Sequence, residues 1–234
     1  MITQLHETIR PRWVNPTDQE WVASALPGSP HSLADLTAMD EVGQELTRGL
    51  HAIETVAGHR FLVGTDLYRI HAIKLDRQSP LPSGSYQFQE GCWTRYAATL
   101  DTSRLGPYLA RVDDSAPATI KLDRETVTRI QAQHENHPEL LVVLEPGRVR
   151  LFTSAADLEP VETISRDPFT CTGGEAEPLV AMQWPVMAAA VEAGMTTWAG
   201  AGHIGPFRSG VFNRLAVIIG IAFKPPAAVE VAAS

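Results

Sequence analysis

The feature that most constrains the fold is a Thr65-Asp66 corner between two apolar stretches. Phe61 and Val63 precede this corner two residues apart, and apolar residues return from Ile70 onward. A period of two is typical of a half-buried strand, and an aspartate at a bend can accept hydrogen bonds from the backbone that follows it. The pattern therefore predicts two strands of an antiparallel sheet joined by a tight bend.

The composition is that of a packed globular protein. The chain has 234 residues, of which 44% are hydrophobic and 20% charged, enough for one large domain or two of ordinary size. Its most apolar run, residues 215–223, is too short to span a bilayer, and residues 1–7 do not have the pattern of a secretory signal. Cys92 and Cys171 are far apart with no motif around them, which fits a reducing compartment. We therefore expect a cytoplasmic protein with no membrane partner.

Caps and breakers predict three helices. Thr17 and Glu20 have the spacing of a capping box at the start of the first helix. The other two helices are expected over residues 124–133, after a capping Asp123, and over residues 186–193, before Gly194.

Strand signals alternate with these helices. They lie at residues 46–56, 118–122, 140–144, 149–152, 178–182, 207–211 and 215–223, with a hairpin made by residues 85–89 and 93–96. A strand, a single helix and antiparallel strands thus recur three times, which predicts an α+β protein. A generic α+β protein with no special repeat is the alternative.

Residues 65–71 resemble a signature of the bacterial DNA polymerase III beta subunit, the sliding clamp, in which a strand leads into Thr-Asp-Gly-His-Arg-Leu-Ala. Residues 106–112, 119–127 and 215–224 are similar to later segments of the same family, in the same order and spacing. The resemblance covers about residues 15–224. It implies the DNA-clamp fold, in which strand-helix-antiparallel strand units repeat and the helices lie on one face of curved sheets.

One departure from the family concerns residues 79–112, which are too short for the usual second unit of the first domain. In this respect the chain resembles shortened clamp-like proteins found in phages. The resemblance implies a shortened N-terminal domain over residues 1–112. It also implies a C-terminal domain over residues 113–234, with a loose tail from about residue 225.

The function that the resemblance implies is that of a processivity factor, a sliding clamp that does no bond chemistry and needs no cofactor or metal. Its expected partners are double-stranded DNA, held without sequence specificity, short peptides of a DNA polymerase and a clamp loader, and further copies of itself in a dimeric or trimeric ring. A clamp-like adaptor or decoy that binds the same peptides without encircling DNA is the alternative. The missing unit and the few cations on the predicted helices favour this alternative.

The resemblance also implies two sites. The peptide pocket would have an apolar wall of Thr65, Ile70, Pro107, Val112 and Ile221, with Arg69 at its rim. The DNA-facing residues would be Arg124 and Arg129. Without the resemblance, the apolar members of the pocket are interpreted as core strand residues, and the two arginines fit a solvated helix face equally well.

The net charge of -8 argues against an ordinary DNA-binding domain, which is usually basic. It is compatible with a ring whose outer face is acidic while a few cations face the channel.

A metal-dependent enzyme is the third hypothesis. His134 and His137 are three residues apart at a predicted helix end, but no nearby cysteine or carboxylate completes a metal site. His51, His59 and His71 fall near one another on predicted paired strands, where we expect core or surface polar roles.

Overall fold

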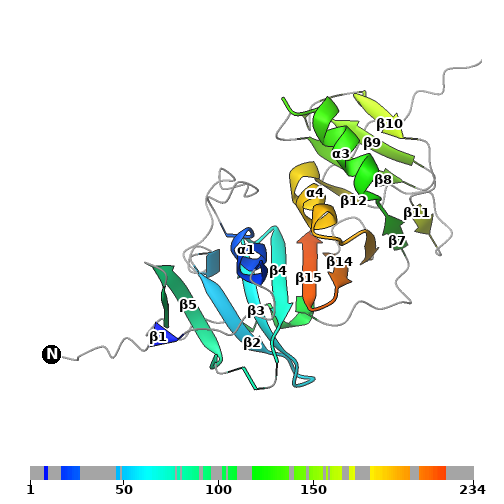
Figure 1. Ribbon diagram of the computed structural model, residues 1–234. Helices are drawn as coiled ribbons and strands as arrows, with labels where there is room; N and C mark the ends of the chain where they lie inside the picture. Colours follow the sequence, from blue (N-terminus) through cyan, green and yellow to red (C-terminus); the bar gives the residue numbers. More distant parts are fainter. Residues whose placement is uncertain are drawn as a thin grey trace, which may run out of the picture. The chain divides into compact units, whose positions relative to one another are not determined.

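A computed structural model (Figure 1) defines the fold. It describes residues 8–9, 17–26, 46–47, 49–76, 78–79, 81–89, 92–95, 102–103, 105–109, 118–136, 140–145, 148–154, 157, 159–164, 169–171, 180–200 and 206–219. Val112, Ile221, His137 and the tail from about residue 225 lie outside these residues.

The chain divides into two compact units. The first is Met1–Val112 together with Arg208–Ile218, and the second is Asp113–Phe207 together with Ile219–Ser234. Residues 208–218, which the sequence analysis placed in the C-terminal domain, therefore belong to the first unit.

The first unit is built on an antiparallel sheet. Its strands follow one another in the order β1-β6-β5-β2-β3-β4-β15-β14. Their bounds are β1 (Thr8–Ile9), β2 (Leu50–Glu54), β3 (Arg60–Thr65), β4 (Arg69–Lys74), β5 (Gly84–Gln89), β6 (Cys92–Arg95), β14 (Pro206–Val211) and β15 (Arg214–Ile219).

The strand pair predicted around the Thr65-Asp66 corner is confirmed. β3 pairs with β4 in the register that places Phe61 opposite Lys74 and Thr65 opposite Ile70. The predicted hairpin of β5 and β6 is also confirmed. One boundary differs, because Leu46 and Thr47 are helical and the strand expected from residue 46 begins at Leu50.

A short helix, α1 (Asp18–Ala23), packs on one face of this sheet against β3 and β4 (Figure 1). Trp21 and Val22 are its buried apolar residues. Gly64 permits the close approach, since a Cβ built there would lie 2.1 Å from the carbonyl oxygen of Val22.

The capping box predicted for α1 is wrong. Thr17 is the N-cap, but its side chain makes no capping hydrogen bond. Its hydroxyl accepts instead from the guanidinium of Arg214 on β15. A long-range contact has therefore replaced the local one that the spacing suggested.

The opposite face of the sheet carries the main apolar cluster, here called the Ile70 cluster. It contains Leu46, Ile53, Phe61, Val63, Ile70, Ala72, Leu105, Leu109, Leu215 and Val217. Leu105 precedes the 3-10 helix η1 (Gly106–Leu109), and Leu109 is the last residue of this helix. Both belong to the cluster, so η1 covers the face that α1 does not.

The second unit contains two antiparallel strand groups and two helices. The strand orders are β13-β7-β11 and β10-β9-β8-β12. The bounds are β7 (Ala118–Lys121), β8 (Leu141–Glu145), β9 (Arg148–Phe152), β10 (Glu162–Ile164), β11 (Phe169–Cys171), β12 (Val180–Gln183), β13 (Thr197–Gly200), α3 (Arg124–Gln133) and α4 (Trp184–Glu192).

Helices α3 and α4 pack against each other. Their buried apolar side chains include Val127 and Ile130 on α3 and Met187 and Val191 on α4. The predicted cap of α3 is confirmed, because the Asp123 carboxylate accepts the backbone N–H of Thr126 at 2.7 Å. Gly194 has φ of 98° just after α4, where glycine adopts the left-handed conformation without steric cost.

The α+β class predicted from the sequence is confirmed, since antiparallel strands are combined with a few short helices. Within the described part of the chain, none of the helices has the length and apolar character needed to cross a bilayer.

Replacing Gly64 with alanine should destabilise the first unit. The new methyl would meet the backbone of α1, which cannot move aside as a flexible side chain can, so we expect a loss of about 1–3 kcal/mol in the free energy of unfolding. Urea denaturation measures this loss of unfolding free energy. Gly106→Ala is the matched control, since open space surrounds that position and its change should stay within about 0.5 kcal/mol. Equal losses in both variants would contradict the close-approach explanation.

His51 should make stability depend on pH. Its Nε2 donates to the Leu46 carbonyl at 2.7 Å, and its Nδ1 lies 2.9 Å from the Ser85 hydroxyl. Burial lowers the pKa of His51 and outweighs the Leu46 hydrogen bond, which raises it. The unfolded chain therefore takes up this proton first as pH falls below about 6.5, and stability declines by up to about 1.4 kcal/mol per pH unit.

Urea midpoints between pH 7.5 and 5 check this expectation. His51→Gln removes the titrating group, so its midpoint should fall less steeply over the same range. Parallel curves for the two proteins would show that His51 does not contribute.

Candidate functional site

Side-chain hydrogen bonds from Thr65 and Asp66 hold the backbone of the bend between β3 and β4. The Thr65 hydroxyl donates to the Arg69 carbonyl at 2.8 Å and accepts the N–H of Leu67 at 2.9 Å. One carboxylate oxygen of Asp66 accepts the N–H groups of Tyr68 and Arg69 at 3.0 and 2.8 Å. The bend therefore has a fixed backbone, as the aspartate at the corner predicted.

Arg69 and Asp66 form a buried ion pair. The distance from Arg69 Nε to Asp66 Oδ2 is 3.1 Å, and the Arg69 side chain is 0% exposed. Burial raises the pKa of Asp66, even though the Arg69 guanidinium and the backbone N–H groups act in the opposite direction. Burial likewise lowers the pKa of Arg69 against the effect of Asp66. Both charges thus carry a desolvation cost that their pairing and their hydrogen bonds to the backbone offset.

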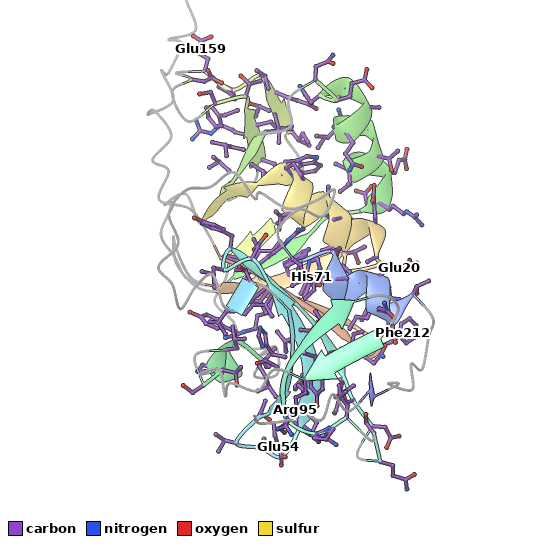
Figure 2. The ribbon with its side chains drawn as sticks, turned by 90° about the vertical axis from the view of Figure 1, so that its left-hand side faces the viewer. Glu20, Glu54, His71, Arg95, Glu159 and Phe212 are labelled. Carbon is purple, nitrogen blue, oxygen red and sulfur yellow. The ribbon has the colours of Figure 1, made fainter. Side chains whose placement is uncertain are left out.

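The same pair connects the sheet to α1. Arg69 Nη2 donates to the Ser24 carbonyl at the C-terminal end of the helix. His71, two residues along β4, stacks on the Trp21 ring with centroids 3.7 Å apart, and its Nδ1 lies 3.0 Å from the Trp21 carbonyl oxygen. These β4 side chains satisfy carbonyl groups that a helix end leaves without intrahelical partners. Figure 2 shows His71 at α1 and Glu20 on the outer side of this helix.

The other end of α1 is bound to β15. Asp18 is buried, and its carboxylate accepts from Arg214 Nε at 2.9 Å and from Asn213 Nδ2 at 3.0 Å. Sequence reasoning missed this cluster, because Asp18 lies about 195 positions from its partners. A charged residue at a helix start predicts an exposed cap far more readily than a buried long-range pair.

Ile70 points away from α1, into the Ile70 cluster. Leu67 and Tyr108 are partly buried and pack on this cluster from outside, while Pro107 beside Tyr108 is exposed. Arg208 on β14 fixes η1 there, because its guanidinium donates to the carbonyls of Tyr108 at 3.1 Å and Pro107 at 3.3 Å.

Leu67 has φ of 74°. For a leucine this left-handed conformation costs about 1–2 kcal/mol, whereas glycine adopts it freely. The clamp signature has glycine at the equivalent position, so the bend keeps a glycine-type backbone while it carries a large apolar side chain. No sequence signal other than this departure pointed to Leu67.

The residues expected in a peptide pocket do not all share one surface. Thr65 and Ile70 lie on the η1 side of the sheet, where Pro107 also lies. Arg69 is not at a rim: neighbouring residues of a strand point to opposite faces, so its side chain is buried under α1. Val112 and Ile221 lie outside the described residues.

The two expected DNA-facing arginines both lie exposed on α3, beside a shallow depression that Glu125 and Thr128 also line. Arg129 already has an anionic partner, since its Nη1 lies 2.6 Å from Glu162 Oε1 on β10. His134 Nε2 lies 3.1 Å from the other oxygen of Glu162. Burial acts to raise the pKa of Glu162, but the hydrogen bonds and charges of these two partners lower it overall.

The histidines do not assemble a metal site in the described residues, where no group of three potential ligands comes together. His51 and His71 are buried and hydrogen-bonded, His59 is exposed, and His134 contacts Glu162. His137 lies outside the described residues. The carboxylate beside His134 was not foreseen, because Glu162 reaches it from a strand 28 positions away.

Removing the Asp66 carboxylate should strongly destabilise the protein. In Asp66→Ala, Arg69 remains buried without its counter-charge, which we expect to cost about 3–5 kcal/mol in urea denaturation. The double variant Asp66→Ala/Arg69→Met should recover part of this loss, since no unpaired charge remains. If the double variant is the less stable of the two, the unpaired charge is not the cause.

Solved structures similar to this chain include bacterial DNA polymerase III beta subunits and DNA polymerase sliding clamps. The DNA polymerase III beta subunit of Borrelia burgdorferi, determined with a natural product, superposes with a TM-score of 0.58 at 8% identity, over 96% of this chain and 66% of that one. The sliding clamp of Caulobacter crescentus gives a TM-score of 0.56 at 14% identity, over 94% and 67%. The sliding clamp of Bacillus subtilis gives 0.51 at 12% identity, over 94% and 66%.

No family model and no curated protein sequence matches the chain. The chain spans about two thirds of the length of the clamp subunits that it resembles. At these identities the similarity establishes the fold. It covers nearly all of the chain, including both compact units, and agrees with the α+β organisation of antiparallel sheets and short helices. The protein therefore has the DNA-clamp fold of the DNA polymerase III beta subunit.

Proposed function

We propose that this protein is a sliding clamp, a DNA polymerase processivity factor that encircles duplex DNA as a homo-oligomeric ring. The observation that carries the proposal is the clamp fold itself, which extends over 94–96% of the chain in the comparisons with the Borrelia, Caulobacter and Bacillus clamps. We propose assembly of two or three copies, in the cytoplasm of a bacterial or phage-infected cell.

The peptide site that we propose for polymerase and loader segments lies on the η1 side of the first unit. The β3–β4 bend and η1 are both fixed there by side-chain hydrogen bonds, from Thr65, Asp66 and Arg208. A preformed apolar surface beside fixed backbone suits a short linear motif, because little has to be ordered when the peptide binds. Leu67, Pro107 and Tyr108 are its accessible members, and Ile70 supports it from beneath.

DNA contact through α3 would be weak, as a clamp that slides requires. Arg124 is exposed, whereas Arg129 is already paired with Glu162. Helix α1 carries Glu20 on its exposed side and no cation. Few phosphate contacts mean a shallow dependence of DNA affinity on salt.

The second candidate function is a non-encircling adaptor or decoy that binds clamp-interacting peptides. The pairing of Arg129 with Glu162 favours it, because it leaves Arg124 as the one unpaired arginine on the exposed side of α3 among the described residues. The net charge of -8 adds a general repulsion from DNA.

The solution mass tests the ring. Light scattering at several protein concentrations should give a stable dimer or trimer. The oligomer should then be retained on nicked circular DNA during gel filtration in high salt and be lost after the DNA is linearised, because topological linkage does not depend on ion pairs. A monomer at every concentration would exclude the self-assembled ring and leave the adaptor.

A test variant and a matched control probe the DNA contact through α3. Arg124→Ala should reduce the slope of log affinity against log salt by about one, measured on linear duplex DNA. Lys74→Ala removes an exposed cation from β4 rather than α3 and should leave the slope unchanged. Equal slopes for both variants would contradict a DNA-facing α3.

A further inference from the structure

The carboxylate of Glu162, the first residue of β10, contacts two residues of the α3 segment through different oxygen atoms. Its Oε1 lies 2.6 Å from Nη1 of Arg129. Its Oε2 lies 3.1 Å from Nε2 of His134, the C-cap of the helix. Because each partner has its own oxygen, one contact can break while the other still holds the carboxylate in place.

The two contacts differ in their exposure to solvent. The Arg129 side chain is 43% exposed, whereas the side chains of His134 and Glu162 are 14% and 20% exposed. An ion pair with an exposed partner is screened by water and salt and contributes little to stability. An anion in solution can therefore replace Glu162 at Arg129 more readily than at His134.

Arg129 also borders the shallow depression on α3, which Arg124 and Glu125 line as well. Glu162 and Gln133 both contact Arg129 through Nη1, and among the described residues neither Nε nor Nη2 has a partner. A guanidinium offers five N–H donors in a planar fork that fits carboxylate and phosphate oxygens alike. The bound carboxylate thus identifies the class of ligand that this position accepts, which is an oxyanion.

We propose that Glu162 is an internal competitor for DNA on α3, whose carboxylate occupies Arg129 until a phosphate of the duplex displaces it. His134 then retains the displaced carboxylate, so β10 stays attached to the helix. Arg124 makes no ion pair among the described residues and gives the first phosphate contact, and Arg129 adds a second one only by exchange. This inference rests on the proposed DNA contact of α3 and adds how that contact is kept weak.

The test variant is Glu162→Gln, which removes the competing charge and keeps the shape of the side chain. Its affinity for a short linear duplex should rise about two- to fivefold, the range that an exposed ion pair contributes. The slope of log affinity against log salt should steepen by about one, because Arg129 then neutralises a phosphate. Fluorescence anisotropy of a labelled duplex at a series of salt concentrations measures both quantities.

Glu159→Gln is the matched control. Glu159 is an exposed carboxylate shortly before β10 (Figure 2), and its substitution changes the net charge by the same amount. The salt slope of this variant should equal that of the wild type. As a second control, Glu162→Gln is placed in an Arg129→Ala background, where the gain should vanish because no guanidinium remains to be released.

A titration of the wild type covers the case in which Glu162→Gln does not fold. The side-chain carboxyl carbon of Glu162 is followed by carbon NMR of the isotope-labelled full-length protein while duplex DNA is added. Its signal should shift as Arg129 exchanges the carboxylate for a phosphate. The corresponding signal of Glu159 should stay constant.

The outcomes separate this inference from the DNA contact on which it rests. If Glu162→Gln shows no gain, the same gain as Glu159→Gln, or a gain that persists without Arg129, the internal competitor is refuted while the DNA contact stands. A Glu162 signal that stays constant while DNA binds refutes it as well. Binding by Glu162→Gln alone supports the inference and leaves the adaptor as the function of the wild type. If neither protein binds the duplex, the DNA contact of α3 is refuted, and this inference with it.

Discussion

The first unit depends on a charge that is buried where helix and sheet meet. Arg69 is inaccessible to water, so the fold must supply both its counter-charge and its hydrogen-bond acceptors. Asp66, three residues earlier, supplies the charge and shapes the bend with the same carboxylate, and the end of α1 supplies an acceptor through Ser24. A helix of six residues has little stability of its own. It persists because the sheet satisfies its C-terminal carbonyls and holds its buried Asp18.

Local patterns predicted well wherever a local interaction decides the structure. The Thr65-Asp66 bend, the Asp123 cap and the hairpin of β5 and β6 need only residues a few positions apart, and all three are present. Thr17 shows the limit, because its spacing to Glu20 indicates a capping box while its hydroxyl binds Arg214. A guanidinium brought from β15 is a charged donor and makes a stronger hydrogen bond than a neutral one.

The sequence predicted the position of the β3–β4 bend but not the directions of its side chains. The signature at residues 65–71 identified the correct bend, but it could not show that Arg69 and Ile70 face opposite sides of the sheet with different partners. Nor could the sequence show that Glu162 neutralises Arg129, since these residues meet only after α3 and β10 have packed. One face of the sheet thus carries paired polar groups that position α1, and the other carries the buried apolar Ile70 cluster.

Residues 208–218 belong to the first unit although they are synthesised after most of the second, and this affects the order in which the two units can fold. β15 pairs with β4 along five residues, although about 145 positions separate them, and it brings the partners of Asp18 with it. On the ribosome, the β4 edge and the buried carboxylate must wait until the second unit has emerged. Assembly of the two units is therefore sequential only in part, because the earlier-made unit is finished by the later-made segment. Closing so long a loop is slow, and the unpaired β4 edge is meanwhile prone to aggregation.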